Sequence, residues 1–315
     1  MLSTPWSESF GLRVPIVNAP MGGVAGGRLA AAVTAAGGLG MVGMGSVATL
    51  ELLRAQLEHV RGTFGIGLVD WVMRNEAGLF EDALAARPAL LSVSFGTDWS
   101  WVGKARDAGI ATATQVYDDV GARRAADAGV DVLVARGAEG GGHGDVKLAT
   151  LPLLDAVLDA VSVPVLAGGG IASPRSLAAV LAAGASGAWV GTRLAACPEA
   201  LTGDGSRRAL IAASATDTAV TRVFDVARGL PWPARFPSRV LDNDFVAQWA
   251  GKEEVLDKSA CDELAAATAA DDRRIAPVDA GQGVGMIRDD ASVGEVIEQM
   301  CAGAERLLTG WGRRA

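Results

Sequence analysis

Short apolar runs alternate with alanine-rich segments along the first two thirds of the chain, and this rhythm constrains the fold more than any other feature. Most runs are apolar throughout, which is typical of parallel strands covered on both faces. The intervening segments, such as "GRLAAAVTAAGG" and "SPRSLAAVLAAG", have helical length and often end in Ala-Gly, a common helix C-cap. The predicted strands are residues 15–21, 39–44, 64–69, 90–95, 111–116, 130–136, 163–169 and 187–193.

Eight such strand–helix units can close into a barrel or form an open, doubly wound sheet. The repeat is regular at roughly 22 to 30 residues per unit, a little above a minimal βαβ unit. No GxGxxG follows the first strand, which weakens the case for an open dinucleotide-binding sheet. We therefore predict an α/β fold of the (β/α)8 TIM barrel type.

The rhythm stops after Arg193. Between about 200 and 280 the chain holds "GLPWPARFPSRV" and charge-mixed helical stretches, and we expect no strands there. These observations predict a barrel formed by 1–205 and 278–315, with a small, mainly helical insertion or cap at 206–277. The amphipathic tail "ASVGEVIEQMCAGAERLLTGW" is expected to pack back as the last barrel helix.

Bulk properties narrow the class of protein. The chain has 315 residues and a net charge of -8, which argues against nucleic-acid or anionic-membrane partners. We see no signal peptide and no apolar stretch of the roughly 18 residues that a membrane span needs. The three cysteines are odd in number and far apart in sequence, so we expect a reducing, cytoplasmic compartment.

In a barrel, functional groups lie at the carboxyl ends of the strands, and two neighbouring ends here are rich in glycine. The seventh strand runs into Gly168, Gly169 and Gly170, and Ser173-Pro174 then has the signature of a helix start. The eighth strand ends at Gly191 and Thr192. A single glycine-rich turn is usually only a turn. Two on adjacent strands favour a phosphate site made of backbone amides.

Two other strand ends offer contacts for a flat ligand. The turn "NAPMGG" would bring Ala19 and Met21 close to a ring at the barrel mouth. Gln115 ends the fifth strand with an amide that can donate and accept hydrogen bonds. The alternatives are a plain turn in the first case and a hydrogen bond to a neighbouring loop in the second.

The sixth strand ends in "RGAEGGGHGD", which contains Gly142 and His143. Histidine is the side chain best suited to proton transfer near neutral pH, so we predict that His143 is catalytic. Glu139 orients the loop or the imidazole, or is a solvated charge, and Asp145 is expected to be a cap or turn residue. The other histidine, His59, near the end of an amphipathic helix, is expected to have no such role. No nucleophile elbow or metal-ligand constellation stands out.

These motifs resemble the nitronate monooxygenase family, formerly called 2-nitropropane dioxygenases, and its relative, the FMN-dependent enoyl-acyl-carrier-protein reductase. "GAEGGGHGD" resembles the family's Gly-x-Glu-Ala-Gly-Gly-His signature, and the segments around "AGGGIASP" and "GTR" resemble its phosphate-binding half. The resemblance implies a TIM barrel that holds FMN non-covalently, with the phosphate on Gly168–Gly170, Gly191 and Thr192. The isoalloxazine would lie over Ala19–Met21 near Gln115, close to the Gly142 backbone, and beside His143.

Three positions depart from the family pattern: Gly67 replaces an asparagine, Gly140 replaces the signature's alanine, and Asp145 replaces a glycine. The resemblance implies that the protein acts on a small-molecule substrate and oxidises alkyl nitronates with O2. A homodimer is one possible assembly. An alternative is NAD(P)H-dependent reduction of activated alkenes. Another is a barrel without catalysis that binds a flavin or another phosphorylated ligand.

Overall fold

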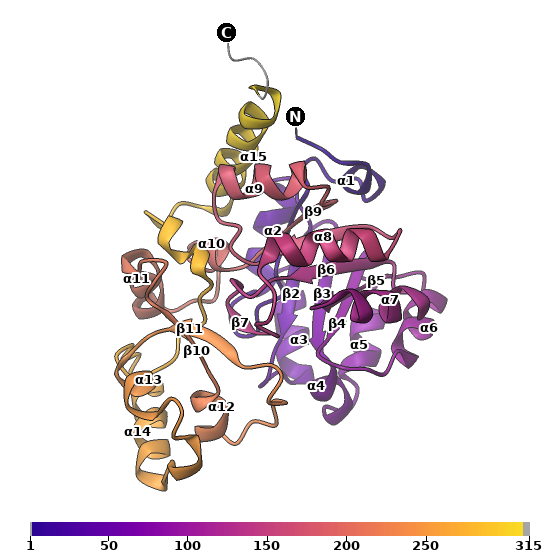
Figure 1. Cartoon of the computed structure of the whole chain (residues 1–315). Helices are drawn as coiled ribbons and strands as arrows, with labels where there is room; N and C mark the ends of the chain where they lie inside the picture. Colours follow the sequence, from indigo (N-terminus) through magenta and orange to yellow (C-terminus); the bar gives the residue numbers. More distant parts are fainter. Residues whose placement is uncertain (1, 311–315) are drawn as a thin grey trace.

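Eight parallel strands form the barrel at the centre of this computed structural model, which describes residues 2–310 (Figure 1). The strand order is β1-β9-β8-β6-β5-β4-β3-β2, and a bridge between Val17 and Leu39 joins the two ends. The predicted barrel is therefore confirmed. Its strands are β1 (Ile16–Asn18), β2 (Gly40–Met44), β3 (Phe64–Val69), β4 (Leu90–Ser94), β5 (Ala111–Val116), β6 (Val132–Arg136), β8 (Val165–Gly168) and β9 (Gly187–Val190).

Helices cover the outside of the barrel. The last of them, α15, packs against α9 and α2, as predicted for the tail, although the predicted segment ends at Trp311, outside the described residues. The contact is close, because a Cβ at Gly303 would lie 2.5 Å from Pro174 Cβ. The barrel helices are α2 (Gly27–Ala35), α3 (Leu50–Leu57), α4 (Asp70–Asn75), α5 (Leu79–Ala85), α6 (Ser100–Asp107), α7 (Asp119–Asp127), α8 (Thr150–Ala160), α9 (Pro174–Ala182), α10 (Thr192–Ala195) and α15 (Val293–Gly310).

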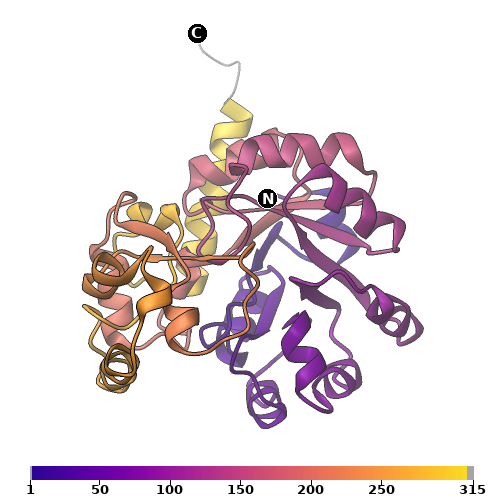
Figure 2. The same ribbon diagram turned by 60° about the horizontal axis from the view of Figure 1, so that its bottom comes forward.

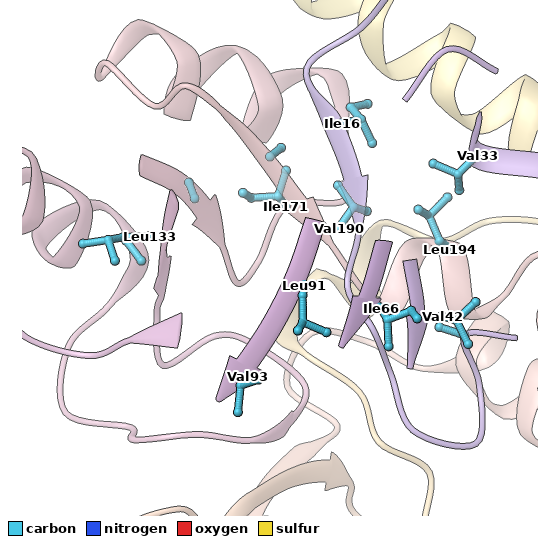
Figure 3. Close-up of a cluster of buried hydrophobic side chains, with 14 of the residues drawn as sticks. Ile16, Val33, Val42, Ile66, Leu91, Val93, Leu133, Ile171, Val190 and Leu194 are labelled. Carbon is cyan, nitrogen blue, oxygen red and sulfur yellow. The ribbon is translucent and has the colours of Figure 1, made fainter. Parts of the chain in front are cut away.

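The core has two layers because strand side chains alternate in direction. Ile16, Leu133 and Val190 pack outward against the helices, within the cluster shown in Figure 3. Their neighbours, including Val17, Val134 and Trp189, fill the barrel interior. Trp6, on the short helix α1 (Pro5–Ser9), joins this inner layer. Both layers are apolar, which explains why the strands read as continuous hydrophobic runs.

The insertion lies to one side of the barrel in both views (Figures 1 and 2) and has its own buried core, which includes Phe224, Phe245 and Leu264. Its helices predominate, as expected. Its elements, with the return to the barrel, are α11 (Asp204–Ala212), β10 (Thr218–Thr221), α12 (Val223–Ala227), β11 (Ser238–Leu241), α13 (Asp244–Trp249), η1 (Glu253–Val255), α14 (Lys258–Ala269) and η2 (Gln282–Met286).

The expectation of no strands between 200 and 280 is wrong. β10 and β11 pair antiparallel, and β11 also pairs with β7 (Gly142–His143), from the loop after β6. Each insertion strand has only four residues, and its pairing partners are distant in sequence, so a local pattern does not reveal them. The boundaries of the insertion at 206 and 277 stay a prediction. Leu210 of α11, inside the predicted insertion, shares a buried cluster with Val284 of η2, in the predicted barrel segment, so this cluster does not separate the two parts.

None of the helices between residues 2 and 310 combines the length and the apolar composition that a membrane span requires.

Candidate functional site

A cavity of about 530 Å³ opens at the carboxyl ends of the barrel strands, between the barrel and the insertion. Its volume is in the range of small-molecule and cofactor sites. All of the predicted site residues line it, and so do three residues that were not predicted: Arg136, Asp225 and Trp232. The predicted residues are Ala19, Met21, Gln115, Gly142, His143, Gly168, Gly169, Gly170, Gly191 and Thr192.

The turn after β8 exposes backbone amides to the cavity. Gly169 and Gly170 have φ values of +109° and +68°, which disfavour any residue with a side chain. Within residues 2–310, the amides of Gly170 and Ile171 find no acceptor in the protein. Ser173 caps the following helix by accepting from the Ser176 amide at 3.2 Å, as predicted. Unpaired amides beside a helix N-terminus suit an anion such as a phosphate.

The turn after β9 adds to the same end of the cavity. The Thr192 hydroxyl oxygen accepts a hydrogen bond from the Gly281 amide at 2.9 Å, which leaves its own O–H to donate elsewhere. A Cβ at Gly191 would lie 3.5 Å from Met21 Sδ and 3.7 Å from Ala19 Cβ. The β9 turn and the β1 turn therefore lie side by side, as expected for the ends of two paired strands.

The β1 turn explains the departure at Gly67. A Cβ at Gly67 would lie 2.2 Å from Pro20 Cγ, so the proline ring occupies the space that an asparagine side chain would need. Gly43 faces the same turn, since its Cβ would lie 2.4 Å from the Pro20 carbonyl carbon. Pro20 itself lines the cavity. In this chain, the first turn packs down on β2 and β3 and takes the place of a side chain from β3.

Gln115 reaches the cavity from β5, and a hydrogen bond to its amide oxygen orients the side chain. Tyr117 donates its hydroxyl proton to Gln115 Oε1 at 3.2 Å. Burial raises the pKa of Tyr117 above its usual range, so the phenol keeps its proton and remains a donor. The amide NH2 of Gln115 is then free to donate into the cavity.

Arg136, at the end of β6, organises the glycine-rich loop. The side chain is 5% exposed, and within residues 2–310 no carboxylate pairs with it. Its Nη2 instead donates to the carbonyl oxygens of Gly140, Gly141 and Gly142 at 2.8, 2.9 and 2.9 Å. Burial lowers the pKa of this guanidinium, although an arginine stays charged at neutral pH. The buried guanidinium of Arg136 therefore holds the glycine-rich loop through the loop's own carbonyl oxygens.

The departure at Gly140 follows from Arg136. A Cβ at Gly140 would lie 2.7 Å from Arg136 Nε, and one at Gly144 would lie 2.4 Å from Arg136 Nη1. An arginine with this conformation thus needs glycine at both positions. A charged residue at the end of an otherwise apolar strand, directly before a glycine run, is the signal in the sequence that could have revealed this arrangement.

The two acidic residues of the loop also have partners. Glu139 accepts from the Thr150 amide at 2.8 Å, at the start of α8, so it orients the loop and not the imidazole. Asp145 accepts from the Lys147 amide at 3.2 Å, which confirms a turn role. It also accepts from Arg235 Nε of the insertion at 2.9 Å. The aspartate that replaces the family's glycine at this position therefore adds a contact to the insertion.

His143 lies on β7, opposite Ser238 of β11. Its Nε2 is 2.9 and 3.0 Å from the two carboxylate oxygens of Asp225, on α12. Its ring stacks on Trp232 with centroids 3.6 Å apart and planes 7° apart. No local sequence signal marks Asp225, which is 82 residues from His143. His59, by contrast, is exposed and does not line the cavity.

A metal ion bound by a protein requires several ligating side chains close together. Residues 2–310 contain no group of three or more His, Cys, Asp or Glu side chains that could hold a metal ion. The polar groups of the cavity include amides, hydroxyls, an imidazole, guanidinium groups and the carboxylates of Asp225 and Asp279. The unpaired amides and the guanidinium groups suit an organic anion or an anionic cofactor.

Comparisons with known proteins agree with this geometry. A family model described as nitronate monooxygenase matches residues 3–65 and 76–303. An indene-carboxyl-CoA dehydrogenase of Rhodococcus jostii is 33% identical over 258 residues, covering 78% of this chain and 67% of the relative. A nitronate monooxygenase of Pseudomonas aeruginosa is 31% identical, covering 80% and 93%. FabK of Thermotoga maritima superposes with a TM-score of 0.83 and 25% identity, covering 98% of both chains. The chain therefore belongs to the nitronate monooxygenase family of flavin oxidoreductases.

Proposed function

We propose that the protein binds FMN and oxidises alkyl nitronates, such as propionate 3-nitronate, with O2, giving a carbonyl compound and a nitrogen oxide. One observation carries this proposal: a single cavity joins a turn with unpaired backbone amides to an imidazole held by a carboxylate. The similarity to a nitronate monooxygenase over 93% of that relative supports the choice of substrate.

The residues present fit FMN. The unpaired amides of Gly170 and Ile171, together with Gly168, Gly169, Gly191 and Thr192, would hold the phosphate. Ala19, Met21, Gln115 and the Gly142 backbone would contact the ring system. When bound, the flavin supplies the redox chemistry, and the protein supplies binding and orientation.

The chain's own residues would act on the substrate through charge and proton transfer. The buried positive charge of Arg136 favours an anion in the cavity. His143 would hydrogen-bond the nitro oxygens of a nitronate when its imidazole carries both ring protons, and as a neutral imidazole it would accept the α-proton of a neutral nitroalkane. The insertion, which contributes Trp232 and Asp225 to the cavity wall, would limit the access of water.

The test is His143→Asn. We expect this variant to keep the yellow flavin spectrum and to lose roughly 100- to 10,000-fold in oxygen uptake with a nitronate, the usual range for a lost acid–base group. His59→Asn is the matched control, because His59 is exposed and lies outside the cavity, and it should retain full activity. Undiminished turnover in His143→Asn would remove His143 from the mechanism.

A second candidate is a reductase of activated alkenes that uses NAD(P)H, which the superposition on FabK over 98% of both chains favours. Anaerobic mixing with NADPH separates the two. Rapid bleaching of the flavin supports the reductase, and an unchanged spectrum supports the monooxygenase. Protein that shows no flavin spectrum, even after FMN is added, would instead support a barrel that binds another phosphorylated ligand.

A further inference from the structure

The imidazole of His143 is held by side chains that come from the insertion and not from the barrel. His143 lies on a two-residue strand whose partner, β11, also belongs to the insertion. The glycines before it contribute no side-chain contacts, so the backbone alone cannot fix the plane of the ring. Whatever orients the imidazole must reach it from outside its own loop.

Asp225 makes the first of these contacts. Both carboxylate oxygens of Asp225 lie within hydrogen-bond distance of His143 Nε2, at 2.9 and 3.0 Å. The His143 side chain is only 15% exposed and that of Asp225 only 7%. An ionised carboxylate can only accept hydrogen bonds, so Nε2 must carry the proton. Nδ1 is then the ring nitrogen left for a substrate. Within residues 2–310 it has no hydrogen-bond partner.

Trp232 makes the second contact. Its indole covers one face of the imidazole in a nearly parallel stack, with centroids 3.6 Å apart. The indole is itself anchored, because Nε1 donates to Ser46 Oγ at 2.9 Å and Phe95 packs edge-on at 4.9 Å. The stack therefore fixes the plane of the imidazole, while the carboxylate fixes its rotation and the nitrogen that carries the proton.

We propose that Asp225 and Trp232 are positioning residues, and that the insertion sets His143 as a base acting through Nδ1. The role in turnover rests on the proposed function. With a neutral nitroalkane, the α-C–H bond would break and an Nδ1–H bond would form. The electron pair left on carbon would delocalise into the nitro group and give the nitronate. The Asp225 carboxylate would stabilise the resulting imidazolium. A preformed nitronate needs no such step.

The first experiment does not depend on activity. The chain has only two histidines, so ¹⁵N-histidine NMR of a His59→Asn protein reports on His143 alone. We expect a downfield, slowly exchanging proton on Nε2 that disappears in Asp225→Ala. Asp145→Asn removes another buried carboxylate, which belongs to the same loop as His143, and should leave this signal in place. A proton on Nδ1, or an Nε2 signal that survives in Asp225→Ala, would refute the proposal.

The second experiment uses turnover and the isosteric variant Asp225→Asn, after circular dichroism has shown that it is folded. We expect kcat/KM for a neutral nitroalkane to fall roughly 100-fold or more, and that for the preformed nitronate to fall less than about 10-fold. Equal losses on both substrates would point to a structural role and would contradict the proposal. Absence of nitronate turnover in the unmodified protein would remove the proposed function but leave the NMR result standing.

Trp232 is tested by a pair of variants. Trp232→Leu removes the stacking face and should lower kcat/KM for the neutral nitroalkane about 2- to 10-fold, the fold-change expected from the loss of one aromatic pair. Trp232→Phe keeps an aromatic face and should recover most of that loss. If Leu and Phe behave alike, the indole only fills space and does not position the imidazole.

Discussion

The two ends of the cavity are built on different principles. At one end, the turns after β8 and β9 present backbone amides and a threonine hydroxyl from neighbouring strand ends. At the other end, His143 depends on Asp225 and Trp232, which are 82 and 89 residues away along the chain. The first end needs only the barrel, whereas the second needs the insertion docked on it. We therefore expect changes in the glycine turns to affect cofactor binding, and changes in the insertion to affect the imidazole.

The largest effect that tests this comparison is expected from Gly169→Ala. The φ of Gly169 is +109°, and a Cβ would lie 2.8 Å from Thr150 Oγ1 and 3.0 Å from the Gly137 carbonyl oxygen. We expect a loss of about 1–3 kcal/mol of stability from backbone strain, together with loss of bound FMN. Flavin content after purification and thermal unfolding measure both.

Gly103→Ala is the control for Gly169→Ala. Gly103 lies inside α6, and a Cβ there would meet nothing within 4 Å. It should leave flavin content unchanged and raise stability by about 0.5–1 kcal/mol, since alanine is the better helix former. Normal flavin retention in Gly169→Ala would show that the anion is held elsewhere in the cavity.

An intermediate effect is expected where Arg136 supports the glycine loop. Restoring the signature's alanine, Gly140→Ala, would place a Cβ 2.7 Å from Arg136 Nε and should cost about 1–3 kcal/mol through overpacking. The same change should cost less in an Arg136→Gln background, where the shorter side chain leaves room. A double-mutant cycle of unfolding free energies gives the coupling. Additive effects would mean that the two positions are independent and that something other than Arg136 accounts for the glycine at position 140.

The sequence predicts the first end of the cavity better than the second, for a physical reason. Strand ends and glycine turns are set by local periodicity, so β3 and β5 have the predicted bounds, and Gly169 and Gly170 have the positive φ that a tight turn requires. The hydrogen bond between Asp225 and His143 is a tertiary contact, and no spacing rule connects an aspartate on a short helix to a distant histidine. β10 and β11 are missed for the same reason, because their pairing is non-local. Arg136 lies between these cases, since its place in the sequence was visible but its four carbonyl partners were not.

The smallest effect concerns the cysteines, which lie both in the barrel and in the insertion. Burial raises the pKa of Cys197 and Cys301, both in the barrel, to about 12, whereas Cys261 lies partly exposed on α14 of the insertion. At pH 8 a thiol with such a pKa is ionised in only about one molecule in 10,000, and the thiolate is the reactive form. We therefore expect a disulfide reagent to titrate one thiol per folded chain quickly, and the other two only when the barrel opens. Flavin binding and activity should be unaffected by Cys261→Ser. Fast reaction at Cys197 in that variant would show that the barrel opens locally near α10, and the end of the cavity built on the barrel would then be the less stable one.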